Sequence, residues 1–282
     1  AACRNALELS MTVQPHATAS GASAALVEDP VPSELPQLVV PDTLEGFQSI
    51  AAEHRHAFLG KVIGVTGSCG KTSTKDLLAL LLGERTLCTE GNLNNFLGVP
   101  LTLTRLDNDE HDFAVVEAGI NEPGEMRVLN HMIKPDIAII TCVAPAHLEK
   151  LGSVEGVARE KARLGEGADE VIFPGDCLQY APFQQFGSRA LVVTDKPELC
   201  EPFLDCQSVA YEVSDVGVGS CRLKLKSAAI PPIEVSLPFT SPGMVSNAAL
   251  AITAALRCGL SHDTIQERLR RWKPTARRGE WR

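Results

Sequence analysis

The residues best suited to chemistry lie between Lys61 and Thr72, in the sequence KVIGVTGSCGKT. An apolar run meets a loop of small residues, Gly67–Gly70, and Lys71 follows at once. Glycines let backbone N–H groups approach phosphate oxygens without a Cβ clash, and a following helix adds unpaired N–H donors at its N-terminus. Lys71 supplies a charge for terminal phosphates, and the Thr72 hydroxyl suits a phosphate-bound Mg²⁺. The stretch predicts a phosphate-binding loop.

The loop departs from the common pattern in its glycine spacing. That pattern places a glycine five residues before the Gly of Gly-Lys-Thr, where this chain has Val65. A solvated strand–helix turn is the alternative, but it leaves the Lys-Thr pair unexplained. Cys69 lies inside the loop, where it can serve simply as a small residue, although a thiol at a helix N-terminus can have a lowered pKa.

Two further side chains follow apolar runs of strand type. Glu117 ends the run Phe113–Val116 and could be an oxygen ligand for Mg²⁺, although a strand-end carboxylate also serves as a cap or ion-pair partner. His147 follows the run Ile137–Ile140 in a loop. A neutral imidazole can bind a divalent cation, but Mg²⁺ prefers oxygen, so the residue type alone leaves its role open.

Lys161 falls on the apolar stripe of a predicted helix, whereas Glu160 points away from that stripe. Spacing alone favours snorkelling, in which the stem is buried and the ammonium stays in water. Alternatively, desolvation lowers the pKa of Lys161 and leaves a neutral amine that can take up CO₂ as a carbamate. The stripe comprises Val154, Val157, Ala158 and Lys161.

Two polar segments could bind substrate or simply shape the backbone. The first contains Asn92, Asn94 and Asn95, whose amides could hydrogen-bond a substrate or tolerate turn conformations. The second is Asn247, which precedes an Ala-rich helical segment, Ala248–Leu256. It could be an N-cap or could pair with the edge of a purine.

The elements that must position these residues alternate between strand and helix. Such alternation predicts an α/β fold, with a P-loop and a mostly parallel sheet flanked by helices. Stricter alternation at Cys221–Leu225 and Ile233–Leu237 predicts a short antiparallel addition. The predicted parallel strands are Val62–Val65, Phe113–Val116, Ile137–Ile140, Val171–Phe173 and Ala190–Val193.

The chain divides into three predicted parts. Residues 1–42 are rich in Ala, Ser and Pro and read as an extended linker, with a short strand at Leu38–Val40. Residues 43–272 form the main domain, which starts with a helix over Thr43–Leu59. Its last helix opens at Ser261–Asp263, and residues 273–282 begin a second linker after the stop at Pro274.

Composition excludes several classes of protein. The 282 residues carry a net charge of −9, which argues against non-specific nucleic-acid binding. No apolar run approaches the length of a membrane span, and no signal peptide is visible. The nine scattered cysteines are typical of reduced, mostly buried thiols in a cytosolic protein. A cytoplasmic protein without a membrane span is expected.

Taken together, these motifs resemble the Mur ligase family of ATP-dependent amide-bond-forming enzymes. The likeness spans about Gly21 to Arg282. Cys69 stands where the family more often has Asn or Ser, and the segment Ser241–Asn247 lacks a His that often precedes the helix. The motifs are Thr66–Thr72, Gly91–Asn95 continuing to Gly98–Thr102, Glu117–Asn121, Ala146–Glu149 with Gly152–Ser153, and Lys161.

The resemblance implies a role for each residue. ATP would be bound by the loop residues Thr66, Gly67, Ser68, Cys69, Gly70, Lys71 and Thr72. Asn247 would contact the adenine. Thr72 and Glu117 would hold one Mg²⁺, and His147 a second. Lys161 would be carbamylated, which favours the carbamate over snorkelling, and Lys71, His147 and Lys161 would be catalytic. Asn92, Asn94 and Asn95 would contact substrate.

The resemblance also implies a reaction. ATP would phosphorylate the terminal carboxylate of UDP-N-acetylmuramoyl-tripeptide, and the amine of D-Ala-D-Ala would then displace phosphate, as peptidoglycan precursor synthesis requires. The segment Thr89–Thr102 favours this branch over a MurE-like or folylpolyglutamate synthase-like sister ligase. A monomer acting on small molecules is expected.

The resemblance further implies missing parts. Only the end of an N-terminal, UDP-binding domain is expected, near Gly21–Asp42, and a C-terminal domain would start near Arg278–Glu280. The chain is therefore expected to be a fragment. A nucleotide-binding module without turnover is the alternative function.

Overall fold

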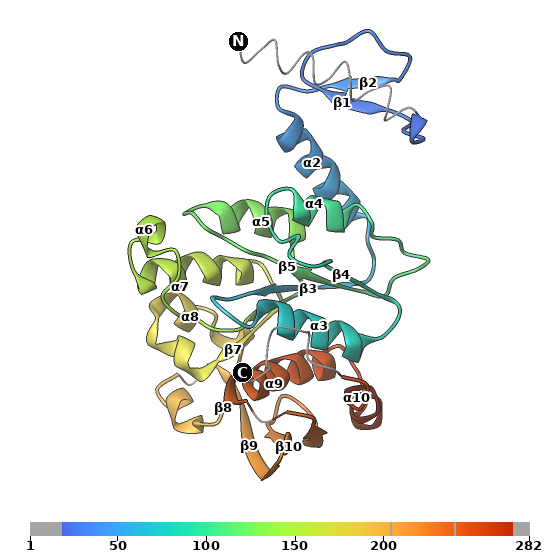
Figure 1. The fold of residues 1–282 in the computed structure, drawn as a ribbon. Coiled ribbons are helices and arrows are strands. Elements are labelled where there is room, and N and C mark those ends of the chain that lie inside the picture. The colour runs from blue at the N-terminus through green and yellow to red at the C-terminus, as the bar shows by residue number, and fades with distance from the viewer. Residues whose placement is uncertain (1–18, 204, 240, 273–282) are drawn as a thin grey trace.

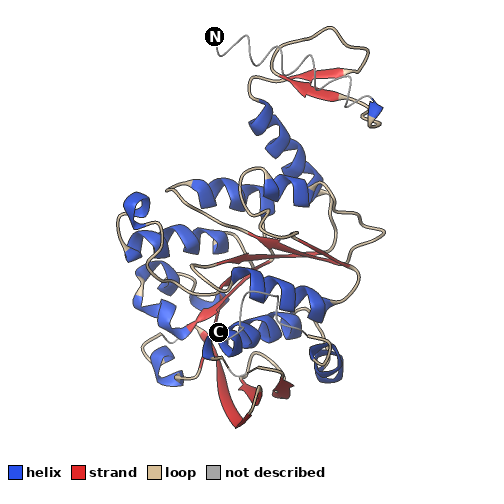
Figure 2. Cartoon of the chain, viewed as in Figure 1, coloured by secondary structure: helices blue, strands red, loops and turns tan. Residues whose placement is uncertain are grey.

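The computed structural model describes residues 19–203, 205–239 and 241–272. The expectations for residues 1–18 and 273–282, including the helix stop at Pro274, lie outside the described residues. Most of the described chain builds one nine-stranded sheet with helices on both faces (Figures 1 and 2).

The strands cross the sheet in the order β11-β10-β9-β8-β7-β6-β3-β5-β4. Neighbours from β4 to β9 pair in parallel, whereas β10 pairs antiparallel with both β9 and β11. This arrangement confirms the predicted fold class. The strands are β3 Lys61–Thr66, β4 Thr86–Cys88, β5 Phe113–Glu117, β6 Ile137–Ile140, β7 Glu170–Pro174, β8 Ala190–Thr194, β9 Gln207–Gly217, β10 Ser220–Lys226 and β11 Ile233–Leu237.

Helices cover both faces and give the sheet two cores. Side chains alternate along β3: Ile63 and Val65 belong to the core beneath α3, α9 and α10, while Val62 belongs to the core beneath α2, α4, α5 and α7. The predicted runs are apolar throughout because both faces are covered. The helices are α2 Thr43–His56, α3 Lys71–Leu82, α4 Gly98–Leu103, α5 Glu125–Ile133, α6 Leu148–Leu151, α7 Val154–Ala162, α8 Ala181–Gln184, α9 Pro242–Arg257 and α10 His262–Leu269, with 3₁₀ turns at Arg163–Gly165, Gly175–Gln179, Gly187–Arg189 and Pro197–Cys200.

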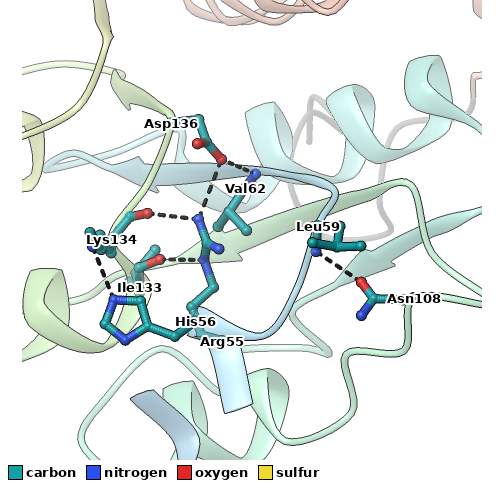
Figure 3. Close-up of polar contacts among 8 residues, drawn as sticks. All are labelled: Arg55, His56, Leu59, Val62, Asn108, Ile133, Lys134 and Asp136. Carbon is teal, nitrogen blue, oxygen red and sulfur yellow. Dashed lines mark hydrogen bonds and ion pairs between the residues drawn. The ribbon is translucent and has the colours of Figure 1, made fainter. Parts of the chain in front are cut away.

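A small parallel pair, β1 Ala25–Val27 with β2 Gln37–Val39, lies at the N-terminal end of α2, away from the large sheet (Figure 1). It confirms the short strand expected near Leu38. The other end of α2 is fixed to the main body by Arg55, whose side chain is 9% exposed (Figure 3). Its guanidinium contacts the start of β6 and the end of α5, so α2 leaves the body from a fixed point.

Candidate active site

The predicted phosphate-binding loop lies at a switch point of the sheet. Gly67–Gly70 joins the carboxyl end of β3 to α3, and β3 lies between β5 and β6. Ligands of open α/β sheets bind beyond the carboxyl ends of strands at such a point. Helix α3 starts at Lys71, and no side chain caps its first turn. Its first N–H groups are therefore available to an anion, as the sequence predicts.

Two positions in this loop require glycine for packing. A Cβ on Gly67 would lie 1.8 Å from the Thr141 hydroxyl oxygen. A Cβ on Gly70, where φ is +81°, would lie 2.6 Å from Oδ1 of Asn247. Backbone approach to neighbouring side chains, and not loop mobility, explains both glycines.

Hydrogen bonds hold the loop against the residues that follow β6. The Ser68 N–H donates to the carbonyl of Cys142 at 3.0 Å, and the Ser68 hydroxyl donates to the carbonyl of Ala144 at 2.9 Å. The Thr141 hydroxyl donates to the carbonyl of Cys69. The loop is thus shaped before any ligand arrives.

Three predicted ligands of ATP have their side chains in different settings. The Lys71 ammonium donates to the carbonyl of Gly67 at 2.9 Å, across the loop that it is expected to serve. Thr72 is partly exposed in the first turn of α3. Thr66 is fully buried, and its hydroxyl donates to the carbonyl of Ala118 at 2.8 Å. Thr66 therefore supports the sheet with its side chain.

The structure favours the interpretation of Cys69 as a small loop residue over the alternative of a thiol with a lowered pKa. Burial and a hydrogen bond with Cys142 raise the pKa of Cys69 to about 11, and the nearby charges of Lys71 and Lys161 only partly oppose this. Desolvation outweighs the helix N-terminus here, so the thiol stays protonated near neutral pH.

Glu117 ends β5 as a carboxylate that is 1% exposed. Its Oε1 accepts a hydrogen bond of 2.8 Å from the Asn94 amide, while its buried Oε2 has no hydrogen-bond partner. An unpaired buried carboxylate oxygen is costly unless a cation meets it, so the residue fits Mg²⁺. In the described chain, no group of three His, Cys, Asp or Glu side chains could hold a metal ion. Phosphate oxygens and Thr72 would have to supply further ligands.

The asparagine-rich segment is held by its own amides. Asn95 Oδ1 accepts from the N–H groups of Leu97 at 3.2 Å and Gly98 at 2.9 Å, where α4 begins. Asn94 supports Glu117, so both side chains shape the site. Asn92 is exposed.

Lys161 lies in α7 and is only 3% exposed, which argues against the snorkelling interpretation. Desolvation, followed by the positive charge of Lys71, lowers the pKa of Lys161 to about 8. Glu160, which the spacing places off the stripe of Lys161, is buried as well. Its Oε1 accepts from the N–H groups of Gly124 at 2.9 Å and Met126 at 3.0 Å, at the start of α5.

The two remaining predicted residues lie just before α6 and within α9. His147 is exposed in a left-handed backbone conformation before α6, outside the buried group around Glu117. Asn247 does not cap a helix, because α9 begins at Pro242 with Ser241 as its N-cap. The early start of α9 instead brings the Asn247 amide against Gly70.

Comparison with known proteins agrees with this geometry. A family model described as the Mur ligase middle domain matches residues 65–255. The chain belongs to the Mur ligase family. Within the family, it is 34% identical over 255 residues to the UDP-N-acetylmuramoyl-tripeptide–D-alanyl-D-alanine ligase of Escherichia coli K12, covering 89% of this chain and 55% of that relative.

Solved Mur ligase structures share the fold. MurF from Acinetobacter baumannii superposes with a TM-score of 0.73 at 31% identity, over 92% of this chain and 56% of that one. MurF from Thermotoga maritima in complex with ADP superposes with a TM-score of 0.72 at 24% identity, and the match covers 92% of this chain and 59% of that one. The chain thus spans about half the length of the relatives it matches. In the part that the structure describes, no helix is long and apolar enough to cross a membrane.

Proposed function

We propose that this chain carries the ATP-binding centre of a ligase that adds D-Ala-D-Ala to UDP-N-acetylmuramoyl-tripeptide in the cytoplasm, as a monomer. Two features carry the proposal. Helix α3 follows the loop Gly67–Gly70 with no side-chain cap at its N-terminus, and the buried Oε2 of Glu117 has no hydrogen-bond partner. The names of the relatives support the substrates, and the ADP complex of the Thermotoga maritima protein supports the nucleotide.

The proposed reaction has two steps. The terminal carboxylate attacks the γ-phosphorus of ATP, which gives an acyl phosphate and ADP. The amine of D-Ala-D-Ala then attacks the acyl carbon, phosphate leaves, and the nitrogen loses a proton. Both steps need anions to approach each other, and Lys71 with the loop N–H groups would offset that repulsion. Mg²⁺ held by Glu117 and Thr72 would neutralise phosphate charge, and Asn247 would contact adenine.

Lys161 is proposed to act as a carbamate and His147 to bind a second Mg²⁺. Burial and a pKa of about 8 favour the neutral amine that reacts with CO₂. We expect activity lost in Lys161→Ala to return partly with acetate, which replaces the carbamate oxygens. Failure of this rescue, together with no added carbamate mass on the wild type, would contradict the proposal.

Turnover by the full-length protein tests the ligase assignment. Phosphate release should require both the tripeptide nucleotide and D-Ala-D-Ala. A requirement for a different amine would instead assign the protein to a sister ligase.

A nucleotide-binding module without turnover is the second candidate, since the chain spans about half of its relatives. Calorimetry with an ATP analogue, run beside a ligation assay on these 282 residues, separates the two. Nucleotide binding without ligation favours the module, and measurable ligation excludes it.

A further inference from the structure

Two cysteine thiols meet at the phosphate loop. Cys69 lies in the loop and Cys142 follows β6, and their sulfur atoms are 3.0 Å apart. Cys69 is exposed and Cys142 is partly exposed, so small reagents can reach the pair. The backbone N–H of Cys69 also points at Cys142, with 3.2 Å between the nitrogen and Sγ.

We propose that Cys69 and Cys142 form an oxidisable dithiol whose disulfide lowers the affinity of the phosphate loop for nucleotide. The proposal rests on the proposed function only in naming the ligand that is lost. It adds a reversible modification site to the loop itself.

The oxidant we name is a peroxide. The Cys69 sulfur, as a thiolate, attacks one peroxide oxygen, the O–O bond breaks, and the departing oxygen leaves as water, which gives a sulfenic acid. Cys142 then attacks the Cys69 sulfur, the S–O bond breaks, and a second water carries away the thiol proton. The two thiols lose two electrons, and hydrogen peroxide becomes two waters.

A disulfide would compete with phosphate for one N–H group. In the thiol form, the Cys142 sulfur can rotate away when a phosphate oxygen takes the N–H of Cys69. A disulfide holds the two sulfurs about 2.05 Å apart and removes that freedom. The loop backbone cannot easily shift to free this N–H group, because Ser68 is hydrogen-bonded to Cys142 and Ala144 and Gly67 packs on Thr141.

Cys69 is exposed at the surface, but partial desolvation of its thiol and the hydrogen bond with Cys142 disfavour the reactive thiolate. Its pKa of about 11 keeps the thiol protonated near neutral pH, so oxidation should be slow there and faster in alkaline buffer. The titratable groups around it are Cys142, Lys71 and Lys161, and the two lysines favour the thiolate.

The test compares each protein with itself before and after one molar equivalent of hydrogen peroxide. Peptide mapping scores the Cys69–Cys142 link, and calorimetry with Mg²⁺ and ADP scores affinity. We expect the link to form in the wild type, affinity to fall at least tenfold, and dithiothreitol to restore it. Cys142→Ser and Cys142→Ala should show no link and no such fall.

A matched control keeps both thiols of the pair. Cys177→Ala removes a buried neighbour of Cys142 and should respond to peroxide as the wild type does. Cys200 and Cys206, whose thiols also hydrogen-bond, remain in every variant. A fall that persists in Cys142→Ser would therefore come from another thiol or from the sulfenic acid of Cys69 alone, and either source would overturn the role given to the disulfide.

Two further results would overturn it: no Cys69–Cys142 link, or a link with unchanged affinity. Reduced wild type that binds no nucleotide would instead contradict the proposed function. The existence of the dithiol would then be decided by the peptide link alone.

Discussion

Glu117 is the buried carboxylate of the candidate site. One of its oxygens is paired with Asn94, and the other is buried without a partner. An unpaired carboxylate oxygen in a buried position lowers stability unless a cation reaches it.

Glu117→Gln should separate these two effects. Removing the buried charge should raise the free energy of unfolding by about 1–2 kcal/mol in metal-free buffer. The Mg²⁺-dependent part of nucleotide affinity should fall, because the amide is a weaker cation ligand. Urea unfolding and calorimetry measure the two quantities. A variant that is less stable yet binds Mg²⁺ and nucleotide normally would show that Glu117 is a structural partner only.

Lys161 makes a prediction about pH. Its pKa is lowered from 10.5 to about 8 in the folded chain, so between these values the unfolded chain binds more protons. The free energy of unfolding therefore rises as pH increases from 8 to 10.5. Below pH 8, burying the charged ammonium lowers the free energy of unfolding by its full amount, about 3 kcal/mol.

Lys161→Met removes the charge while keeping a long apolar side chain. In CO₂-free buffer at pH 7, we expect Lys161→Met to be more stable than the wild type, with the gap closing toward pH 10. Urea unfolding across this range measures the difference, in which other titrating groups cancel. Parallel stability curves would mean that the Lys161 ammonium is hydrated in the folded protein.

At the scale of elements, sequence patterns predict a strand correctly where its apolar residues match the faces that are buried. Both faces of β3, β5, β6, β7 and β8 are covered, so their runs are continuously apolar and easily found. Strand β4 has three residues, and much of β9 is exposed, so neither carries such a run. The order of the strands follows from tertiary packing, which no local pattern reports.

In the candidate site, too, some residues follow from local patterns and others depend on tertiary packing. The loop Gly67–Gly70 and Glu117 lie at the ends of β3 and β5, so local patterns could predict where they lie. Glu160 could not, because its partners are backbone N–H groups 34 and 36 residues away in the sequence. The start of α9 was misplaced because the Ala-rich pattern begins at Ala248, whereas proline fits the first turn and lets the helix begin at Pro242.

Glu160 is predicted to set the stability of the N-terminus of α5. Glu160→Ala leaves the N–H groups of Gly124 and Met126 without their shared acceptor, which should cost about 2 kcal/mol in unfolding free energy. Glu160→Gln keeps an acceptor oxygen and should cost less. Urea unfolding compares the two, and equal losses would mean that the charge, not the acceptor, matters.

At the scale of the whole molecule, Arg55 connects α2 to the main body (Figure 3). It donates to the carbonyls of Ile133 at 3.0 Å and Lys134 at 2.9 Å and contacts the Asp136 carboxylate at 3.3 Å. The same Asp136 oxygen accepts from the N–H of Val62 at 2.7 Å, so one guanidinium joins α2, α5, β3 and the start of β6.

Arg55→Ala should destabilise the protein by about 2–4 kcal/mol, because it leaves buried acceptors and a carboxylate without their partner. Thermal or urea unfolding measures the loss. Arg85→Ala is the matched control, since it breaks the exposed ion pair with Asp112 and should change stability much less. Equal losses in the two variants would contradict the anchoring role of Arg55.

The most direct measurement is calorimetry of a non-hydrolysable ATP analogue with Mg²⁺, on the wild type, Lys71→Ala and the exposed control Lys226→Ala. Lys71→Ala should bind roughly 10- to 100-fold more weakly, since one charge-assisted contact is lost, while its unfolding midpoint and the affinity of Lys226→Ala stay at wild-type values. Folded Lys71→Ala with wild-type affinity would contradict a phosphate site at Gly67–Thr72.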